Sequence, residues 1–286
     1  MVLTVKWNPS SACLVGKTAI VTGSNIGIGY YTALDFAKRG ARVILACRNQ
    51  TKAEKAKSKI INETGNKNVV VKILDLSSFK SVRKFAKEVN ETEKRLDILV
   101  NNAGGGVFTE LYTSDGLKSQ MQKSTPSRVV TVSTTSAIWG KIDTLTLNPS
   151  FRFFCETLTY FTAKLCSHLF TIELAQRLKG TGVTANVVHP GAIKSDFFKG
   201  SPSIPTTLLA ICMKMFFKST KAGAQTSIYV AIANELDGVS GKFFVDCAES
   251  EYLRAIEDRD LAKAVWAKSE EIVKLTLEEK RCFVGP

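Results

Sequence analysis

Short runs of apolar, β-branched residues recur along most of the chain, and this pattern constrains the fold more than any other sequence feature. Runs of this kind are typical of strands buried on both faces of a sheet. Amphipathic stretches separate most of them, such as residues 29–40 with Gly40 as a helix C-cap, and residues 78–95. The alternation predicts an α/β fold with a doubly wound parallel sheet flanked by helices. The predicted strands are Thr18–Gly23, Ala41–Cys47, Val69–Leu76, Leu96–Gly104, Arg128–Ser133, Val183–Gly191 and Gly241–Asp246.

The length and composition indicate one large domain in a reducing compartment. The 286 residues are 44% hydrophobic, enough for a substantial core, and no linker-like or low-complexity stretch divides them. The 7 cysteines are scattered, odd in number and without a C-x-x-C pair, which argues against a disulfide framework. With only 2 histidines as well, we expect no metal site.

The formal net charge of +13 is large, but it does not indicate a nucleic-acid partner. The lysines occur mostly at the spacing of a solvated helix face, as in "TKAEKAKSKIINE", and no aromatic-interleaved basic patch accompanies them. The N-terminus lacks the apolar core of a signal peptide, and no apolar run reaches the length of a membrane span. We expect a cytoplasmic protein, with peripheral contact to an intracellular membrane left open.

A glycine-rich segment, "TGSNIGIG" at residues 22–29, follows the first predicted strand and opens the first predicted helix. Glycines let a backbone turn tightly and approach a pyrophosphate, whose charge meets free N–H groups at the positive end of the helix. Strand, motif and helix in this order predict a nucleotide site of the Rossmann type. Its expected contacts are Gly23, Ser24, Asn25, Gly27, Ile28 and Gly29.

The end of the second predicted strand indicates which nicotinamide cofactor is preferred. An NAD site usually has an acidic side chain there, whereas this chain has Cys47 followed by Arg48. A guanidinium can form a bidentate contact with a 2′-phosphate. NADP(H) is therefore favoured over NAD(H); the alternative is that Arg48 is an ordinary turn residue facing solvent.

From about Gly16 to Asp246 the chain resembles the short-chain dehydrogenase/reductases, by "TGSNIGIG", "DL" at residues 75–76, "NNAG" at 101–104, "YFTAK" at 160–164 and "HPG" at 189–191. The strings "ACRN", "STPSRVVTVS" and "KAGAQTS" are similar to the retinol dehydrogenase branch. The resemblance implies NADP(H)-dependent interconversion of a lipophilic alcohol and its aldehyde or ketone. It also implies cofactor contacts at Asp75, Leu76, Asn102, Ala103, Gly104, Tyr160, Lys164, Pro190 and Gly191.

The same resemblance suggests how the single domain, residues 1–286, is organised. A cofactor half would cover about 16–134, a catalytic and substrate half about 135–248, and a helical tail about 249–286.

Tyr160 and Lys164 are four residues apart in a predicted helix, so they project from one face. A nearby ammonium group lowers the pKa of a phenol, which suits Tyr160 to proton transfer with a substrate oxygen. The family has a serine at the position of Thr134, which polarises that oxygen, and Ser133 stands directly before it. Either hydroxyl can serve, or both can be ordinary strand-end groups.

Residues 105–127 form a short connection where the resemblance implies a longer crossover helix. The best helical piece has only Leu117 and Met121 as an apolar pair, and no asparagine matches the one that supports the lysine in relatives. About twenty residues would be missing. The loss would uncover part of the sheet and leave the oligomeric state open, since this helix commonly pairs subunits. The alternative function is therefore a catalytically impaired nucleotide-binding relative with a binding or regulatory role.

Residues 202–219 are strongly apolar and follow "HPG", where the family covers its substrate. They suit an oily ligand, a membrane surface, or the packing of a core helix. We expect His189 to be a structural residue at a strand end and His168 to lie on a helix surface.

Overall fold

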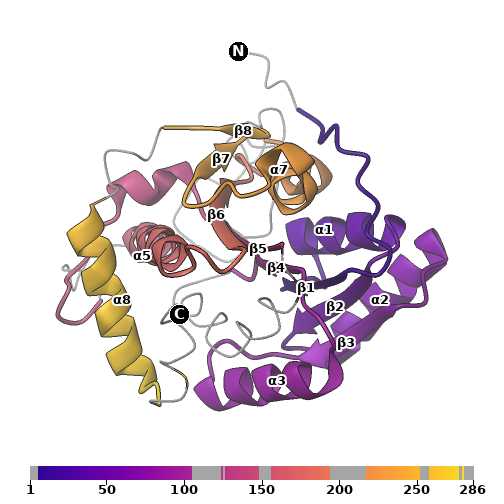
Figure 1. Cartoon of the computed structure of the whole chain (residues 1–286), viewed down its shortest axis with the longest axis horizontal. Helices are drawn as coiled ribbons and strands as arrows, with labels where there is room; N and C mark the ends of the chain where they lie inside the picture. Colours follow the sequence, from indigo (N-terminus) through magenta and orange to yellow (C-terminus); the bar gives the residue numbers. More distant parts are fainter. Residues whose placement is uncertain are drawn as a thin grey trace, which may run out of the picture.

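The sheet has the strand order β3-β2-β1-β4-β5-β6-β7-β8 (Figure 1). The structure is a computed structural model, and it describes residues 6–104, 124, 126–147, 156–193, 217–251, 258–276 and 279, with α5 side chains from residue 158. The described strands are β1 Thr18–Thr22, β2 Arg42–Cys47, β3 Val69–Ile73, β4 Ile98–Asn101, β5 Ser127–Val132, β6 Val183–His189, β7 Phe243–Val245 and β8 Ala248–Glu249. The described helices are α1 Gly27–Lys38, α2 Gln50–Thr64, α3 Phe79–Thr92, η1 Thr135–Trp139, α5 Glu156–Arg177, α7 Thr220–Ile232, η3 Asn234–Leu236 and α8 Arg259–Val273.

The predicted doubly wound parallel sheet is confirmed. Strands β1 to β7 pair in parallel, and each of them overlaps one of the predicted apolar runs. The sequence pattern did not predict β8, which adds an antiparallel edge beside β7. Helix α1 ends at Lys38, and Gly40 follows its C-cap with a φ of 88°. Gly40 thus takes the left-handed conformation that a helix end favours.

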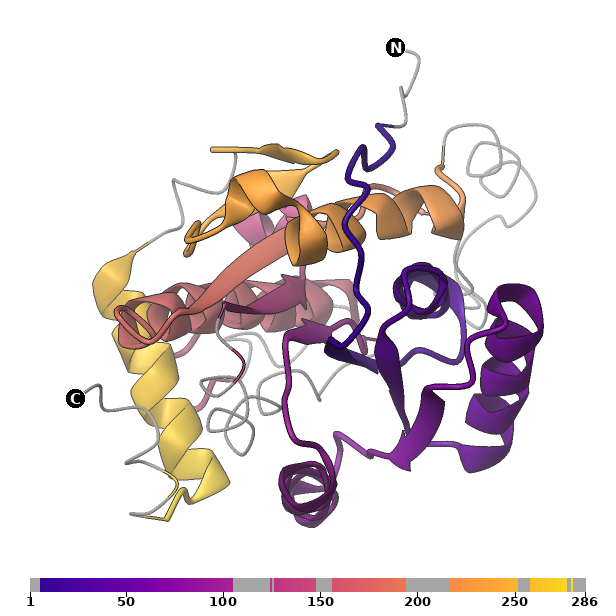
Figure 2. The same cartoon turned by 45° about the vertical axis from the view of Figure 1, so that its right-hand side comes forward.

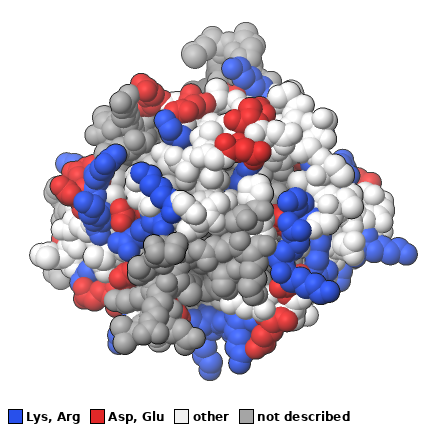
Figure 3. Space-filling view, viewed as in Figure 1, with Lys and Arg blue, Asp and Glu red and all other residues white. Residues whose placement is uncertain are grey.

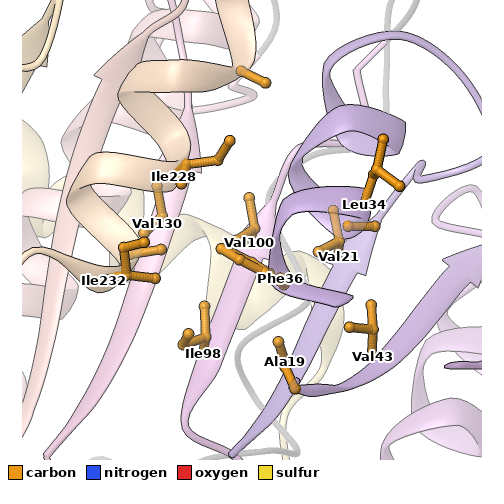
Figure 4. Close-up of a cluster of buried hydrophobic side chains, with 14 of the residues drawn as sticks. Ala19, Val21, Leu34, Phe36, Val43, Ile98, Val100, Val130, Ile228 and Ile232 are labelled. Carbon is orange, nitrogen blue, oxygen red and sulfur yellow. The ribbon is translucent and has the colours of Figure 1, made fainter. Parts of the chain in front are cut away.

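Helices cover the sheet in two layers, with α1, α2 and α7 on one face and α3, α5 and α8 on the other (Figure 2). Neighbouring residues of one strand pack against helices on opposite faces of the sheet, because side chains alternate between the two faces along a strand. Val21 belongs to the core under α1 and α7, whereas Ile20 belongs to the core under α3 and α5. Figure 4 shows the first core, where Phe36 of α1 and Ile228 of α7 meet strand residues such as Val100.

Helix α8 docks against α5 through aromatic stacking. The rings of Phe170 and Trp266 stack at 4.6 Å between centroids, and the Arg177 guanidinium lies 4.5 Å from the Trp266 ring. The prediction that His168 lies on a helix surface is wrong. His168 is fully buried, and its ring packs edge-on against Phe243 of β7 at 5.7 Å. Helix α5 contacts both the sheet and α8, so little of it remains for solvent.

Helix α2 confirms the prediction of a solvated lysine face. Lys52, Lys55 and Lys59 are exposed, while Ala53 and Ile60 face the core. On the face drawn in Figure 3, lysine and arginine side chains are interspersed with aspartate and glutamate. The positive charge on this face is spread among acidic groups.

Most of the connection at 105–127 lies outside the described residues. The described part begins at Ser124, whose hydroxyl accepts a 2.7 Å hydrogen bond from the Leu96 N–H. Strand β5 then starts at Ser127, whose hydroxyl donates to the Leu96 carbonyl at 3.1 Å. The return into the sheet is therefore anchored to the residues before β4.

Candidate active site

The predicted site residues lie on one side of the sheet, at the carboxyl ends of its parallel strands. Parallel strands end on the same side, so the segments that follow β1 to β6 lie along a common line. These segments carry the predicted residues in chain order: Gly23, Ser24, Asn25, Gly27, Ile28 and Gly29 after β1, Arg48 after β2, Asp75 and Leu76 after β3, Asn102, Ala103 and Gly104 after β4, Ser133 and Thr134 after β5, and Pro190 and Gly191 after β6.

The glycine-rich loop and the segment after β4 form one hydrogen-bonded unit. Thr22 Oγ1 accepts from the N–H groups of Asn102 and Ala103 at 3.0 and 2.8 Å, and Asn102 Nδ2 donates to the Thr22 carbonyl at 2.8 Å. A Cβ atom at Gly29 would lie 2.4 Å from Asn102 Nδ2 and 2.7 Å from the Gly23 carbonyl oxygen. Only glycine fits at position 29, and the backbone path of the loop depends on it.

The N-terminus of α1 is suited to an anion. Its N-cap is Ile26, which is exposed and makes no side-chain capping bond. Among the described helices, α2, α3, α7 and α8 are capped by Asn49, Ser78, Ser219 and Asp258. The first N–H groups of a helix need an external acceptor when no side chain supplies one. A pyrophosphate fits this end of α1, both by charge and by the close backbone approach that Gly29 permits.

Two charged residues flank the same loop at the ends of β2 and β3. Arg48 is exposed and directly follows the buried Cys47. The Asp75 carboxylate accepts from the Ser77 hydroxyl at 2.6 Å and the Ser77 N–H at 3.0 Å. These bonds hold the pKa of Asp75 below its usual value, and the charge of Arg48 acts in the same direction. Ser24 is fully buried with its hydroxyl 3.5 Å from Cys47 Sγ, so this side chain faces the protein.

Tyr160 and Lys164 lie on one face of α5, as their spacing predicts. Lys164 Nζ is 5.7 Å from the centre of the Tyr160 ring and donates to the Val132 carbonyl at 3.1 Å. The ammonium group is almost completely buried, at the end of β5. A positive charge therefore lies beside the phenol ring at the edge where the glycine-rich loop also ends.

The two hydroxyls after β5 have different surroundings. Ser133 Oγ donates to the Lys164 carbonyl at 3.0 Å, which uses its proton within the protein. Thr134 is the N-cap of η1, and its Oγ1 accepts from the Ser136 N–H at 3.2 Å. A hydroxyl that accepts in this way still has its own proton to donate. Both side chains are buried.

A buried cation that sequence reasoning missed, Lys218, lies beside the segment that follows β6. Lys218 is 8% exposed, and its ammonium forms an ion pair with Asp246, directly after β7. Beside them, burial lowers the pKa of His189 to about 4, with the Lys218 charge adding to the effect and Asp246 opposing it. The sequence offered only a weak signal, a lysine inside an apolar segment. Most of that segment, residues 202–216, lies outside the described part of the chain.

Two further observations concern metals and membranes. Within the described residues, no three His, Cys, Asp or Glu side chains are grouped closely enough to hold a metal ion. None of the helices in the described ranges combines the length and the apolar character needed to cross a membrane.

The chain is similar to known proteins over most of its length. The family model for short chain dehydrogenase matches residues 17–203. Retinol dehydrogenase 13 of Homo sapiens is 39% identical over 290 residues, which cover 93% of this chain and 87% of the relative. Since 93% of 286 residues is about 266, that comparison includes about two dozen positions at which this chain has no residue.

Solved structures have the same fold. An uncharacterized protein from Mycobacterium paratuberculosis is 28% identical with a TM-score of 0.69, covering 94% of this chain and 98% of that one. L-sorbose reductase from Gluconobacter frateurii, solved with NADPH and L-sorbose, is 20% identical with a TM-score of 0.66, covering 82% of this chain and 97% of that one. With the family match and the relative of 39% identity, these findings establish that the chain is an oxidoreductase of the short-chain dehydrogenase family.

Proposed function

We propose that the protein interconverts a lipophilic alcohol and its aldehyde or ketone with NADP(H), in the manner of a retinol dehydrogenase. The observation that carries the proposal is the position of the Lys164 ammonium. It is buried and lies 5.7 Å from the centre of the Tyr160 ring, at the carboxyl ends of the strands, where the glycine-rich loop also lies. The similarity to retinol dehydrogenase 13 supports an oily substrate.

The cofactor would bind across the carboxyl edge of the sheet. Its pyrophosphate would meet the uncapped N-terminus of α1, and Arg48 would meet a 2′-phosphate. The segments at 75–76, 102–104 and 190–191 would contact the adenosine and nicotinamide parts. When bound, the nicotinamide ring supplies or accepts hydride.

The protein's own groups would move the proton and orient the substrate. In reduction Tyr160 Oη would donate a proton to the carbonyl oxygen, and in oxidation it would accept the alcohol proton. The Lys164 ammonium would stabilise the phenolate that results from donation. Thr134 Oγ1, which accepts from Ser136, would donate its own proton to the same oxygen and hold it near Tyr160.

A second candidate function rests on the two dozen positions that the relative has and this chain lacks. If they belong to the connection at 105–127, Lys164 loses a support that the family provides. The protein would then bind NADP(H) and turn over slowly, with a binding or regulatory role.

One set of measurements tests both candidates. NADPH and NADH are titrated against the unmodified protein, and reduction of all-trans retinal is compared with that of a short, water-soluble aldehyde. We expect tighter binding of NADPH and faster turnover of retinal. Binding without turnover of any aldehyde would favour the second candidate, and failure to bind either dinucleotide would refute both.

A further inference from the structure

The ion pair between Lys218 and Asp246 joins two segments that contain none of the predicted site residues. Lys218 lies just before α7, Asp246 follows β7, and the lysine side chain is 6% exposed whereas the aspartate is 39% exposed. Removing an ammonium group from water costs free energy unless a partner compensates it. Of the described pairs, only this one lies at the end of β6, where the proposed nicotinamide site begins.

Lys218 clamps the turn that follows β6. Its N–H donates to the Ala192 carbonyl at 2.8 Å, and it forms a parallel bridge with Ile193. Gly191 has a φ of 87°, and a Cβ atom at this position would lie 3.0 Å from Lys218 Cδ. The aliphatic part of the lysine therefore occupies the space beside the turn, while its main chain holds the next residues in register.

Asp246 is presented by the tight hairpin turn between β7 and β8. Asp246 and Cys247 are its two central residues, and their φ values of 50° and 56° are those of a type I′ turn. The Cys247 N–H donates to Thr226 Oγ1 of α7 at 3.4 Å, which ties the turn to the same helix that Lys218 precedes.

We propose that Lys218 and Asp246 are positioning residues that hold the turn at 190–193 against the nicotinamide end of the cofactor, an inference that rests on the proposed function. Arg48 directly follows β2, and this turn directly follows β6, four strand intervals away in the sheet order. At about 4.8 Å per interval the separation is about 19 Å. The pair therefore acts on the half of the cofactor that is remote from Arg48.

The test compares the binding of the whole cofactor with the binding of its adenosine half. Lys218→Met removes the charge and keeps the stem, and Asp246→Asn removes the opposite charge. Affinity is measured for NADPH and for adenosine 2′,5′-bisphosphate, which lacks the nicotinamide half. We expect each variant to bind NADPH about tenfold more weakly and the bisphosphate as tightly as the unmodified protein. The double variant should lose no more than either single one, because it leaves no unpaired charge.

Lys242→Met is the matched control, since Lys242 pairs with Glu249 at 2.6 Å between β7 and β8 with both side chains exposed. It should change neither affinity. If the Lys218 and Asp246 variants bound both ligands equally more weakly, the pair would have a merely structural role. If neither ligand bound more weakly, the pair would have no role in binding. Either result overturns the inference.

Hydrogen exchange in the unliganded protein separates this inference from the proposed function. In Lys218→Met, the amide of residue 218, which donates to the Ala192 carbonyl, should exchange faster, whether or not the protein binds a dinucleotide. Unchanged exchange there would refute the clamp. Failure of the unmodified protein to bind NADPH would instead refute the proposed function.

Discussion

The Ser133 hydroxyl donates a 3.0 Å hydrogen bond to the main-chain carbonyl of Lys164, and the Lys164 ammonium donates to the carbonyl of Val132 at 3.1 Å. The end of β5 and the middle of α5 are thus joined in both directions. These bonds position Lys164 beside Tyr160, and they use the Ser133 proton inside the protein. Thr134 is left as the hydroxyl with a proton to donate, so the two neighbours should respond differently to mutation.

Thr134→Val should reduce aldehyde turnover about 10²- to 10³-fold, because one proposed hydrogen-bond donor to the developing oxyanion is lost. Thr134→Ser keeps the hydroxyl and the N-cap of η1, and it should retain turnover. Ser133→Ala should instead lower the free energy of unfolding by about 1 kcal/mol with kcat nearly preserved. Steady-state kinetics and thermal melts of the three variants check this; if Ser133→Ala abolished turnover and Thr134→Val did not, the roles would be reversed.

Tyr160→Phe should reduce the turnover about 10²- to 10⁴-fold, since the change deletes the proposed proton donor. The phenylalanine ring keeps the contact with Phe161, whose centroid is 6.0 Å from that of Tyr160. NADPH affinity should therefore stay within about twofold of the unmodified protein. Turnover and fluorescence titration measure the two quantities, and undiminished turnover in this variant would rule out Tyr160 as the acid.

Arg48→Ala should weaken NADPH binding by about ten- to a hundredfold and leave NADH binding unchanged, because only NADPH has a phosphate for the guanidinium. The control is Lys59→Ala, which removes an exposed positive charge from α2. Titrations of both dinucleotides distinguish a local phosphate contact from a general loss of charge. Equal weakening for NADPH and NADH would contradict the proposed cofactor preference.

The stability of the protein should fall as the solution is acidified from about pH 6.5 to about pH 4. The pKa of His189 is lowered from 6.5 to about 4 in the folded state, so in this window the unfolded state binds the extra proton. The contribution of the neutral, buried His189 to the free energy of unfolding is complete above pH 6.5 and is lost toward pH 4. Its size is about 3 kcal/mol, at about 1.4 kcal/mol per pH unit.

Carboxylates also titrate in this range, so the contribution of His189 is measured as a difference between two proteins. Denaturant unfolding at several pH values compares the unmodified protein with His189→Asn, whose side chain does not titrate. The curve of the variant should have the smaller slope between pH 6.5 and 4. Parallel curves would show that His189 does not contribute.

Lengthening the connection at 105–127 with a family-length amphipathic helix should raise the melting temperature and the rate of retinal reduction. A helix covering several apolar sheet residues contributes about 1.5 to 3 kcal/mol for each large side chain it buries. NADPH affinity should change little, because the glycine-rich loop and Arg48 follow β1 and β2, whereas the connection joins β4 to β5. The control is a Gly/Ser insertion of equal length at the same place, which should give neither gain. Equal stability and turnover in all versions would show that the short connection is harmless.

Most of the sheet could be predicted from the sequence, and so could the position of the proposed site residues at the carboxyl ends of its strands. A strand buried on both faces needs an uninterrupted apolar run, so Ala41–Cys47 predicted β2, which the structure forms at Arg42–Cys47. Because parallel strands end at one edge, the segments after them could be placed together before any contact was known. The four-residue spacing of Tyr160 and Lys164 likewise determined that they share a face of α5.

Only the tertiary structure decided which partners these elements meet. Lys218 and Asp246 are 28 residues apart, and nothing in either local sequence predicts their ion pair. His168 was expected on a helix surface, whereas α5 has the sheet on one side and α8 on another. Ser133 and Thr134 are adjacent hydroxyls with the same local chemistry, and their difference arises from the position of α5 relative to the end of β5. Local patterns specify which side of an element is buried, but the packing of distant segments specifies what lies against it.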